Sequence, residues 1–285
     1  MAANETGAKP TSHDRFRALT RRRWFWPAVV GLVVVLLVAP RMWRVIVPSR
    51  DPFWERIQAT GLWRVAMDAS FPPFEDLNEA GQPVGFDVDL AQAIAARWGV
   101  QVQIEGVGFD GLVDAVQASR VDTAISALPY QPQLTQDVAF SQPYFEAGLV
   151  LVASAGNETV QTVDDLAGRR LAVEWGSEGD VQARALRRRY PDLQILPNET
   201  AQDALQAVAD GSADAALVDR ISALQAASAT NNAIRIAPQA VVSDPYVVVL
   251  PKKAPMLQQQ VREALQALEA DGTLDALTKK WLVGE

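Results

Sequence analysis

The side chains of this chain best suited to hold a ligand follow its predicted strands. An apolar run that begins at Val65 ends in Asp68, and Phe71 and Phe74 follow, separated by two prolines that fix the backbone. A carboxylate and a rigidly held aromatic ring at a strand end are typical of a ligand site on an open α/β sheet. An ordinary turn beside a core aromatic is the alternative that these residues allow.

Further strand ends carry polar or aromatic groups. They are Ser126-Ala127-Leu128-Pro129-Tyr130, Glu174-Trp175-Gly176-Ser177 and Val218-Asp219-Arg220. Clefts between domains are preferred ligand sites. We therefore predict loops from two lobes that face each other across a cleft.

An internal echo supports the expectation of two lobes. Residues 115–125 repeat as residues 207–217, each copy reading as a helix, a tight turn and a strand. Asp122 and Asp214 occupy the same place in the two copies, which lie 92 residues apart. That spacing is too long for a solenoid of short repeats and indicates two lobes with one α/β plan. Chance similarity between helices rich in Ala and Val is the alternative.

The elements that position these loops alternate between strand and helix periodicity. A polar turn is expected at 78–82, and a helix opens at Gly85-Phe86-Asp87. Strands are predicted at 100–104, 121–127, 148–153, 170–173, 213–218 and 246–250. Helices are predicted at 111–118, 163–166, 181–190, 201–210, 219–229, 255–270 and 273–282.

Composition narrows the possible chemistry. The chain has no cysteine, and its one histidine is His13, so disulfides, thiolate or histidine metal sites and Cys or His catalysis are not expected. Residues 51–285 carry 17 Lys/Arg against 32 Asp/Glu. A body this acidic offers no phosphate-binding patch, so we predict no nucleic-acid partner, no cofactor and no metal.

The N-terminal region is basic and then apolar. We predict a cytoplasmic tail at 1–23, a transmembrane anchor at 24–47 and a juxtamembrane connector at 48–61. A cleaved signal peptide is the alternative, although no small-residue cleavage site follows the apolar run. Six Lys/Arg precede that run and three follow it up to residue 50. The positive-inside rule therefore places the N-terminus in the cytoplasm and the body outside the inner membrane, periplasmic or extracellular.

A series of motifs covers nearly the whole body. They are DASFPPFE (68–75), GFDVDLAQAIA (85–95), FDGLVDAVQASRVDTAIS (109–126), DVAFSQPY (137–144), DDLAGRRLAV (164–173), GSADAALVD (211–219) and ADGTLDALTKKW (270–281). In these motifs and their order, the body resembles the family 3 extracellular solute-binding proteins, which serve amino-acid ABC importers. The resemblance implies a binding protein rather than an enzyme, with a small solute and an ABC permease as partners.

The resemblance also implies a fold and a site. The fold is the two-lobed type II periplasmic-binding-protein fold, with lobe I at 62–145 and 246–285, lobe II at 146–245, and crossovers near 145–147 and 243–246. In relatives, aromatics matching Phe71 and Phe109 pack on the ligand, and the aspartate matching Asp219 receives its α-ammonium. The expected ligand-binding residues are Asp68, Phe71, Phe109, Ala127, Pro129, Leu134, Glu174, Trp175, Ser177 and Asp219.

One position departs from the family pattern. Relatives carry an arginine that clamps the ligand's α-carboxylate, and its place falls here on Leu134, while Pro129 replaces a common Ser or Thr. A desolvated carboxylate without that partner loses several kcal/mol, so we predict a small cationic or amine solute. Arg220 is the candidate replacement cation.

Two other functions fit the same resemblance. A few members of this fold class are dehydratases acting on cyclic carboxylates, and Glu174 is then the candidate acid. A sensor that reports its ligand to a membrane partner is the other alternative.

Overall fold

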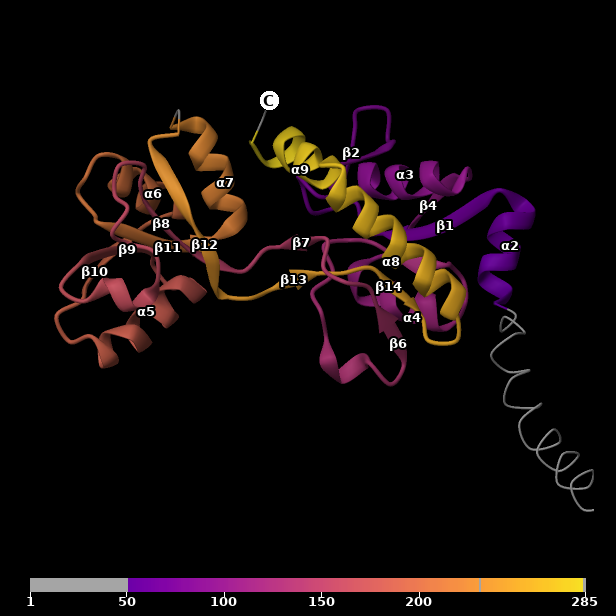
Figure 1. Ribbon diagram of the computed structural model, residues 1–285, viewed down its shortest axis with the longest axis horizontal. Coiled ribbons are helices and arrows are strands. Elements are labelled where there is room, and N and C mark those ends of the chain that lie inside the picture. The colour runs from indigo at the N-terminus through magenta and orange to yellow at the C-terminus, as the bar shows by residue number, and fades with distance from the viewer. Residues whose placement is uncertain (1–50, 231, 284–285) are drawn as a thin grey trace, which may run out of the picture. The chain divides into compact units, whose positions relative to one another are not determined.

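The computed structural model describes residues 51–230 and 232–283 of the 285-residue chain. Two five-stranded mixed sheets form the centre of this part of the chain (Figure 1). The predicted tail and anchor lie outside the described residues. Within the described ranges, every helix is too short or too polar to cross a membrane.

The first sheet has the strand order β4-β1-β5-β14-β6. β1 pairs in parallel with β4 and β5, whereas β14 is antiparallel to β5 and β6. The strands are β1 (Leu62–Met67), β4 (Gln101–Gly106), β5 (Thr123–Ala124), β6 (Val138–Phe140) and β14 (Val249–Pro251).

Helices cover both faces of the first sheet. Successive residues of a strand point to opposite faces, so Val65 and Met67 pack on one side with helices α2, α3, α8 and α9, while Ala66 packs on the other side with α4. The helices are α2 (Pro52–Thr60), α3 (Phe86–Trp98), α4 (Leu112–Gln117), α8 (Pro255–Ala270) and α9 (Thr273–Thr278).

The second sheet repeats this plan with the order β10-β9-β11-β8-β12. β9 is parallel to β10 and β11, and β8 is antiparallel to β11 and β12. Leu151 of β8 packs on the α5 side, and Val150 and Val152 pack on the side of α6 and α7. The elements are β8 (Leu149–Ser154), β9 (Arg170–Glu174), α5 (Glu178–Arg189), β10 (Gln194–Asn198), α6 (Ala201–Ala209), β11 (Ala215–Asp219), α7 (Arg220–Ala229) and β12 (Ile234–Val242).

Two short strands carry the chain between the sheets. β7 (Phe145–Glu146) leads into the second sheet, and β13 (Pro245–Tyr246) leads back, and the two pair antiparallel. Together they form the crossovers. The remaining elements are the hairpin β2 (Asp76–Leu77) and β3 (Pro83–Val84), the 3-10 turns η1 (Phe109–Gly111), η2 (Pro132–Leu134) and η3 (Val163–Leu166), and the π-helical turn η4 (Lys279–Val283).

The internal echo has the same geometry in both sheets. The backbone N–H of Arg64 donates to Asp122 Oδ2 at 2.9 Å, and that of Arg170 donates to Asp214 Oδ2 at 2.8 Å. Each guanidinium also pairs with the other oxygen of the same aspartate, at 3.1 and 2.8 Å. Each aspartate thus joins the strand that it opens to the neighbouring strand, which confirms a shared α/β plan.

The structure differs from the sequence predictions at three places. The segment expected as a connector, 48–61, contains α2, whose start is fixed because the buried Asp51 carboxylate accepts hydrogen bonds from Phe53 and Trp54. Its other oxygen accepts from the N–H groups of Met256 and Leu257 at the start of α8, which ties α2 into the first lobe. The strand predicted at 121–127 is wrong beyond Ala124.

That strand ends early because the chain turns sharply before it reaches the crossovers. Ala127 has a φ of +43°, in the left-handed region that interrupts a strand. The segment predicted as a short helix at 163–166 is a 3-10 turn closed by a Thr162–Asp165 capping box. Most other predicted elements match the described ones to within a few residues.

Candidate functional site

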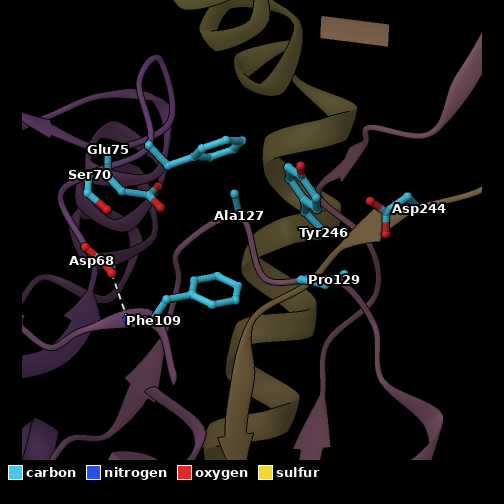
Figure 2. Close-up of a pocket in the computed structure, with 9 residues that line it drawn as sticks. Asp68, Ser70, Glu75, Phe109, Ala127, Pro129, Asp244 and Tyr246 are labelled. Carbon is cyan, nitrogen blue, oxygen red and sulfur yellow. Dashed lines mark hydrogen bonds between the residues drawn. The ribbon is translucent and has the colours of Figure 1, made fainter. Parts of the chain in front are cut away.

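A cavity of about 340 Å³ opens at the carboxyl ends of the first sheet's parallel strands. We call it the first pocket; Figure 2 shows the side chains around it. It contains half of the predicted ligand-binding residues. It is lined by Asp68, Ser70, Phe71, Glu75, Phe109, Ala127, Pro129, Asp244 and Tyr246.

Asp68 is held in place at the end of β1 by two hydrogen bonds. Its Oδ2 accepts from the backbone N–H of Phe109 at 2.7 Å (Figure 2), and its own N–H donates to Ser126 Oγ at 3.0 Å. These bonds connect the end of β1 to the start of η1 and to the loop after β5. Asp68 Oδ1 has no hydrogen-bond donor among the described residues, so it is the oxygen that remains for a ligand.

Aromatic rings form much of the pocket wall. Phe71 and Phe109 are 45% and 46% exposed, unusual for side chains of this size. Phe71 is backed by the fully buried Phe74, whose ring centroid lies 5.9 Å away, and Phe74 packs on Tyr246 at 5.3 Å. Both phenylalanine rings are therefore partly open to solvent, and that of Phe71 is supported from behind by Phe74.

Glu75, which lines this pocket, and Asp87 are both buried carboxyls. Ser126 Oγ donates to Glu75 Oε1 at 2.7 Å, and Asp87 Oδ2 accepts from the N–H of Ala127 at 2.6 Å and the hydroxyl of Tyr144 at 3.0 Å. Their other oxygens, Glu75 Oε2 and Asp87 Oδ1, are buried without a donor. A proton shared between the two groups satisfies both.

The electrostatics indicate where that proton resides. Burial, and then the negative charge of Asp87, raise the pKa of Glu75 to about 10. Burial also raises the pKa of Asp87, to about 6, against the stabilising hydrogen bonds that its carboxylate accepts. At neutral pH Glu75 is therefore the protonated acid, and Asp87 is the anion that it and two other donors surround.

A smaller cavity of about 160 Å³ lies at the carboxyl ends of β9 and β11. In this second pocket, Asp219 Oδ1 accepts from the N–H of Ser222 at 2.8 Å and so caps α7, and Ser177 Oγ caps α5. Because each cap uses one oxygen, Asp219 keeps its second carboxylate oxygen for other partners. The lining residues are Leu149, Glu174, Ser177, Glu178, Gly179, Ala201, Val218 and Asp219.

Three residues considered from the sequence line neither pocket. Leu134 ends η2 and packs against the core cluster beside α4. Trp175 lies in the loop after β9 and is 72% exposed. Arg220, the candidate replacement cation, begins α7 outside both lining sets.

The pockets also contain residues that the sequence reasoning missed. In the first pocket these are Ser70, Glu75, Asp244 and Tyr246. Ser70 and Glu75 belong to the motif DASFPPFE, so the motif itself could have indicated them as site residues. Asp244 and Tyr246 belong to the predicted crossover at 243–246, where a chain passing between lobes borders any cleft between them.

No Lys, Arg or His is among the side chains that line these two pockets. Six carboxyl side chains line them instead, three in each. Among the residues that the structure describes, His, Asp and Glu side chains form no group suited to hold a metal ion. Carboxyl-rich linings of this kind favour a positively charged ligand.

Comparison with known proteins gives one curated relative and two solved structures of particular interest. The L-cystine-binding protein TcyJ of Escherichia coli (strain K12) is 28% identical over 255 residues, 89% of this chain and 94% of the relative. An ancestral cationic amino acid solute-binding protein is 29% identical with a TM-score of 0.57, covering 80% of this chain and 98% of that one. An ancestral cyclohexadienyl dehydratase is 24% identical with a TM-score of 0.70, over 83% and 98% of the two chains, a likeness of fold alone.

A family model matches most of the chain. The model of the bacterial extracellular solute-binding proteins, family 3, covers residues 63–284. That span includes both sheets, both crossovers and both pockets. The chain therefore belongs to the bacterial extracellular solute-binding proteins, family 3.

Proposed function

We propose that this protein is the solute-binding component of an ABC importer and that it binds a small cationic solute, an amine or a cationic amino acid. The observation that carries the proposal is the charge of the two pockets, which are lined by carboxyls and by no basic side chain. A carboxylate removed from water requires a positive partner, or its burial costs several kcal/mol.

The aromatic walls support the same class of solute. Phe71 and Phe109 expose their rings beside the carboxylate of Asp68. A cation over an aromatic face gains about 0.5–2 kcal/mol, more as water is excluded. A carboxylate on one side and π-faces on the other together favour an ammonium or guanidinium group.

The residue at position 134 supports a solute without a strong carboxylate requirement. A leucine stands where the family resemblance leads us to expect an arginine that clamps an α-carboxylate, and this partly buried leucine packs against a core cluster. Neither pocket supplies a substitute cation. An anionic amino acid thus meets six carboxyl side chains and no counter-charge.

The names of the similar proteins agree with a solute of amino-acid size. TcyJ is an L-cystine-binding protein, and the ancestral structure is that of a cationic amino acid binding protein. A first pocket of about 340 Å³ is at the small end of ligand sites, which suits such a solute.

Binding by hinge closure completes the proposal. The two pockets lie in different sheets that β7 and β13 join, so bending of these strands would bring Asp219 toward Asp68 around the solute. We further propose that residues 24–47 anchor the protein in the inner membrane, with the binding lobes on the outer side next to a permease. N-terminal sequencing that finds a mature chain without these residues would contradict the anchor.

The solute class can be tested by isothermal titration of the purified protein. We expect L-arginine, L-lysine and simple amines to bind, and L-glutamate not to bind. Asp219→Asn keeps a good helix cap but removes the charge, so it should weaken L-arginine binding about tenfold to a hundredfold. Asp192→Asn, in the exposed turn after α5, removes the same charge away from the pockets and serves as the control.

Tight binding of L-glutamate that Asp219→Asn leaves unchanged would overturn the proposal. Enzymatic activity is the competing proposal, because a dehydratase shares the fold. Dehydration of a cyclic carboxylate requires a cation for the substrate as well as an acid. Glu174 lines the second pocket, yet no basic side chain lines either pocket, so the site favours binding.

A further inference from the structure

Asp244 stands in the crossover that leads back to the first sheet, directly before β13. Its carboxylate lines the first pocket, on the side away from Asp68, with Tyr246 between them in Figure 2. It belongs to neither five-stranded sheet, whereas Asp68 directly follows β1 of the first sheet and Asp219 is the last residue of β11 in the second. The carboxylate therefore lies at the junction of the two lobes.

The main chain of Asp244 is held firmly. Its N–H donates to Glu146 Oε1 at 2.6 Å, and its carbonyl accepts from the N–H of Ala147 at 3.0 Å. Glu146 Oε2 also accepts from the hydroxyl of Ser243 at 2.7 Å. The carboxylate of Asp244, by contrast, has no hydrogen bond or ion pair within the described residues.

This carboxylate is in electrostatic range of both pockets. Partial burial, and then the charges of Glu146 and Glu178, raise the pKa of Asp244, and Glu178 lines the second pocket. The neighbouring Tyr246 hydroxyl is likewise affected by carboxyls of both pockets. Burial, then the charge of Asp244 and those of further carboxyls including Asp219, raise its pKa. Asp244 is thus close enough to carboxyls of both pockets for their charges to act on it.

A single positive charge cannot neutralise this site. Glu75 is protonated at neutral pH, but five other carboxyl side chains remain in the lining: Asp68 and Asp244 in the first pocket, and Glu174, Glu178 and Asp219 in the second. Closure around a monocation would desolvate carboxylates that have no partner, at a cost in affinity. A solute with two cationic ends supplies a partner on each side.

We propose that Asp244 is a ligand-binding and specificity-determining residue that pairs with a second positive charge on the solute. The site then selects small organic dications, such as a diamine or a guanidino-amine, over monocations of the same length. This inference rests on the proposed function, which requires only that the solute be cationic.

The experiment compares putrescine with n-butylamine, which have the same carbon chain but carry two charges and one. Isothermal titration at fixed pH and ionic strength is performed on the wild type, Asp244→Asn and Glu79→Gln. Glu79, in the exposed β2–β3 turn, controls for net charge. We expect the wild type to bind putrescine at least about tenfold more tightly than n-butylamine.

Asp244→Asn should remove most of that preference. Putrescine binding should weaken about tenfold or more, because a charge-assisted contact is lost. Binding of n-butylamine should change less than about threefold. Asp244→Ala should give the same pattern, and thermal unfolding verifies that both variants are folded.

The outcomes separate this inference from the proposed function. If both amines bind and Asp244→Asn leaves their affinity ratio unchanged, the inference is overturned and the cationic solute class stands. If the wild type binds neither amine nor L-arginine, the proposed function fails as well. Loss of the putrescine preference in Glu79→Gln would also overturn the inference, since net charge alone would then explain it.

Discussion

Replacing Glu75 with glutamine tests the buried carboxyl pair at the first pocket. Glu75 Oε1 accepts from Ser126 at 2.7 Å, and its other oxygen is buried beside Asp87 without a separate donor. In the Glu75→Gln variant, the amide oxygen can accept from Ser126 and the amide nitrogen can donate to Asp87. The substitution therefore keeps the pattern of a protonated Glu75 and removes its titration.

The sign of the effect follows from proton binding. Burial raises the pKa of Glu75 from an ordinary value of 4.5 to about 10, so the folded protein holds a proton there that the unfolded chain releases. This stabilising contribution is fully present below about pH 4.5 and is lost as the pH rises toward about 10. Unfolding should thus become easier with rising pH, by about 1.4 kcal/mol per pH unit.

At pH 7 part of this contribution is already lost. The wild type is then less stable than below about pH 4.5 by roughly 3 kcal/mol, as an upper limit. Glu75→Gln does not undergo that loss. We expect the variant to be more stable than the wild type at pH 7 by up to roughly 3 kcal/mol. The difference should grow at alkaline pH and shrink toward zero near pH 5.

Urea denaturation followed by tryptophan fluorescence at several pH values between about 5 and 9 measures this difference. Glu79→Gln, at an exposed turn, provides the matched control and should stay within about 0.5 kcal/mol of the wild type. A Glu75→Gln variant whose stability parallels that of the wild type at every pH would refute the shared proton. A variant that is less stable throughout would refute the predicted exchange of hydrogen bonds.

Three further substitutions follow from the structure. Ser126→Ala removes a buried hydroxyl that both donates and accepts, so it should cost about 1–3 kcal/mol in urea denaturation and weaken solute binding; unchanged values for both would contradict this. Asp122→Ala should lower the free energy of unfolding by about 3–5 kcal/mol and Asp214→Ala by clearly less, because the Asp122 side chain is fully buried and that of Asp214 is 27% exposed. Equal losses would show that burial does not set the size of the effect. Gly148→Ala would drive a methyl group into the Val242 carbonyl at the end of β12, and we expect about 1–3 kcal/mol of destabilisation in thermal or chemical unfolding; wild-type stability would show that the backbone at these two residues can move apart.

Much of the fold could be predicted from local patterns. The helix at 86–98, the turn at 78–82 and the paired crossovers follow from apolar spacing, turn residues and family motifs. The echo between Asp122 and Asp214 predicted two matching lobes, because the same hydrogen-bonding group recurs at the same place before each strand. The early end of β5 was missed, since the backbone at Ala127 follows from tertiary contacts rather than from residue type.

The residues of the candidate site also differ in how far the sequence could predict them. Asp68, Phe71 and Phe109 could be predicted because a strand end and a motif place them together, and each lines the first pocket. Asp244 and Tyr246 were missed, although they fall in the predicted crossover, because they are distant in sequence from those residues and which crossover side chains line the pocket follows from the tertiary structure. Leu134 shows the converse, since its place in a motif does not bring it into either pocket.

The sequence by itself determined the family, the two-lobed α/β plan and the excess of acidic residues, because these depend on residue types and their spacing along the chain. Only the tertiary structure decided which carboxyls carry charge. Burial and nearby carboxyls raise the pKa values of Glu75 and Asp244. Both causes are properties of the folded chain. Charge in a pocket depends on desolvation, and desolvation exists only after distant segments have packed together.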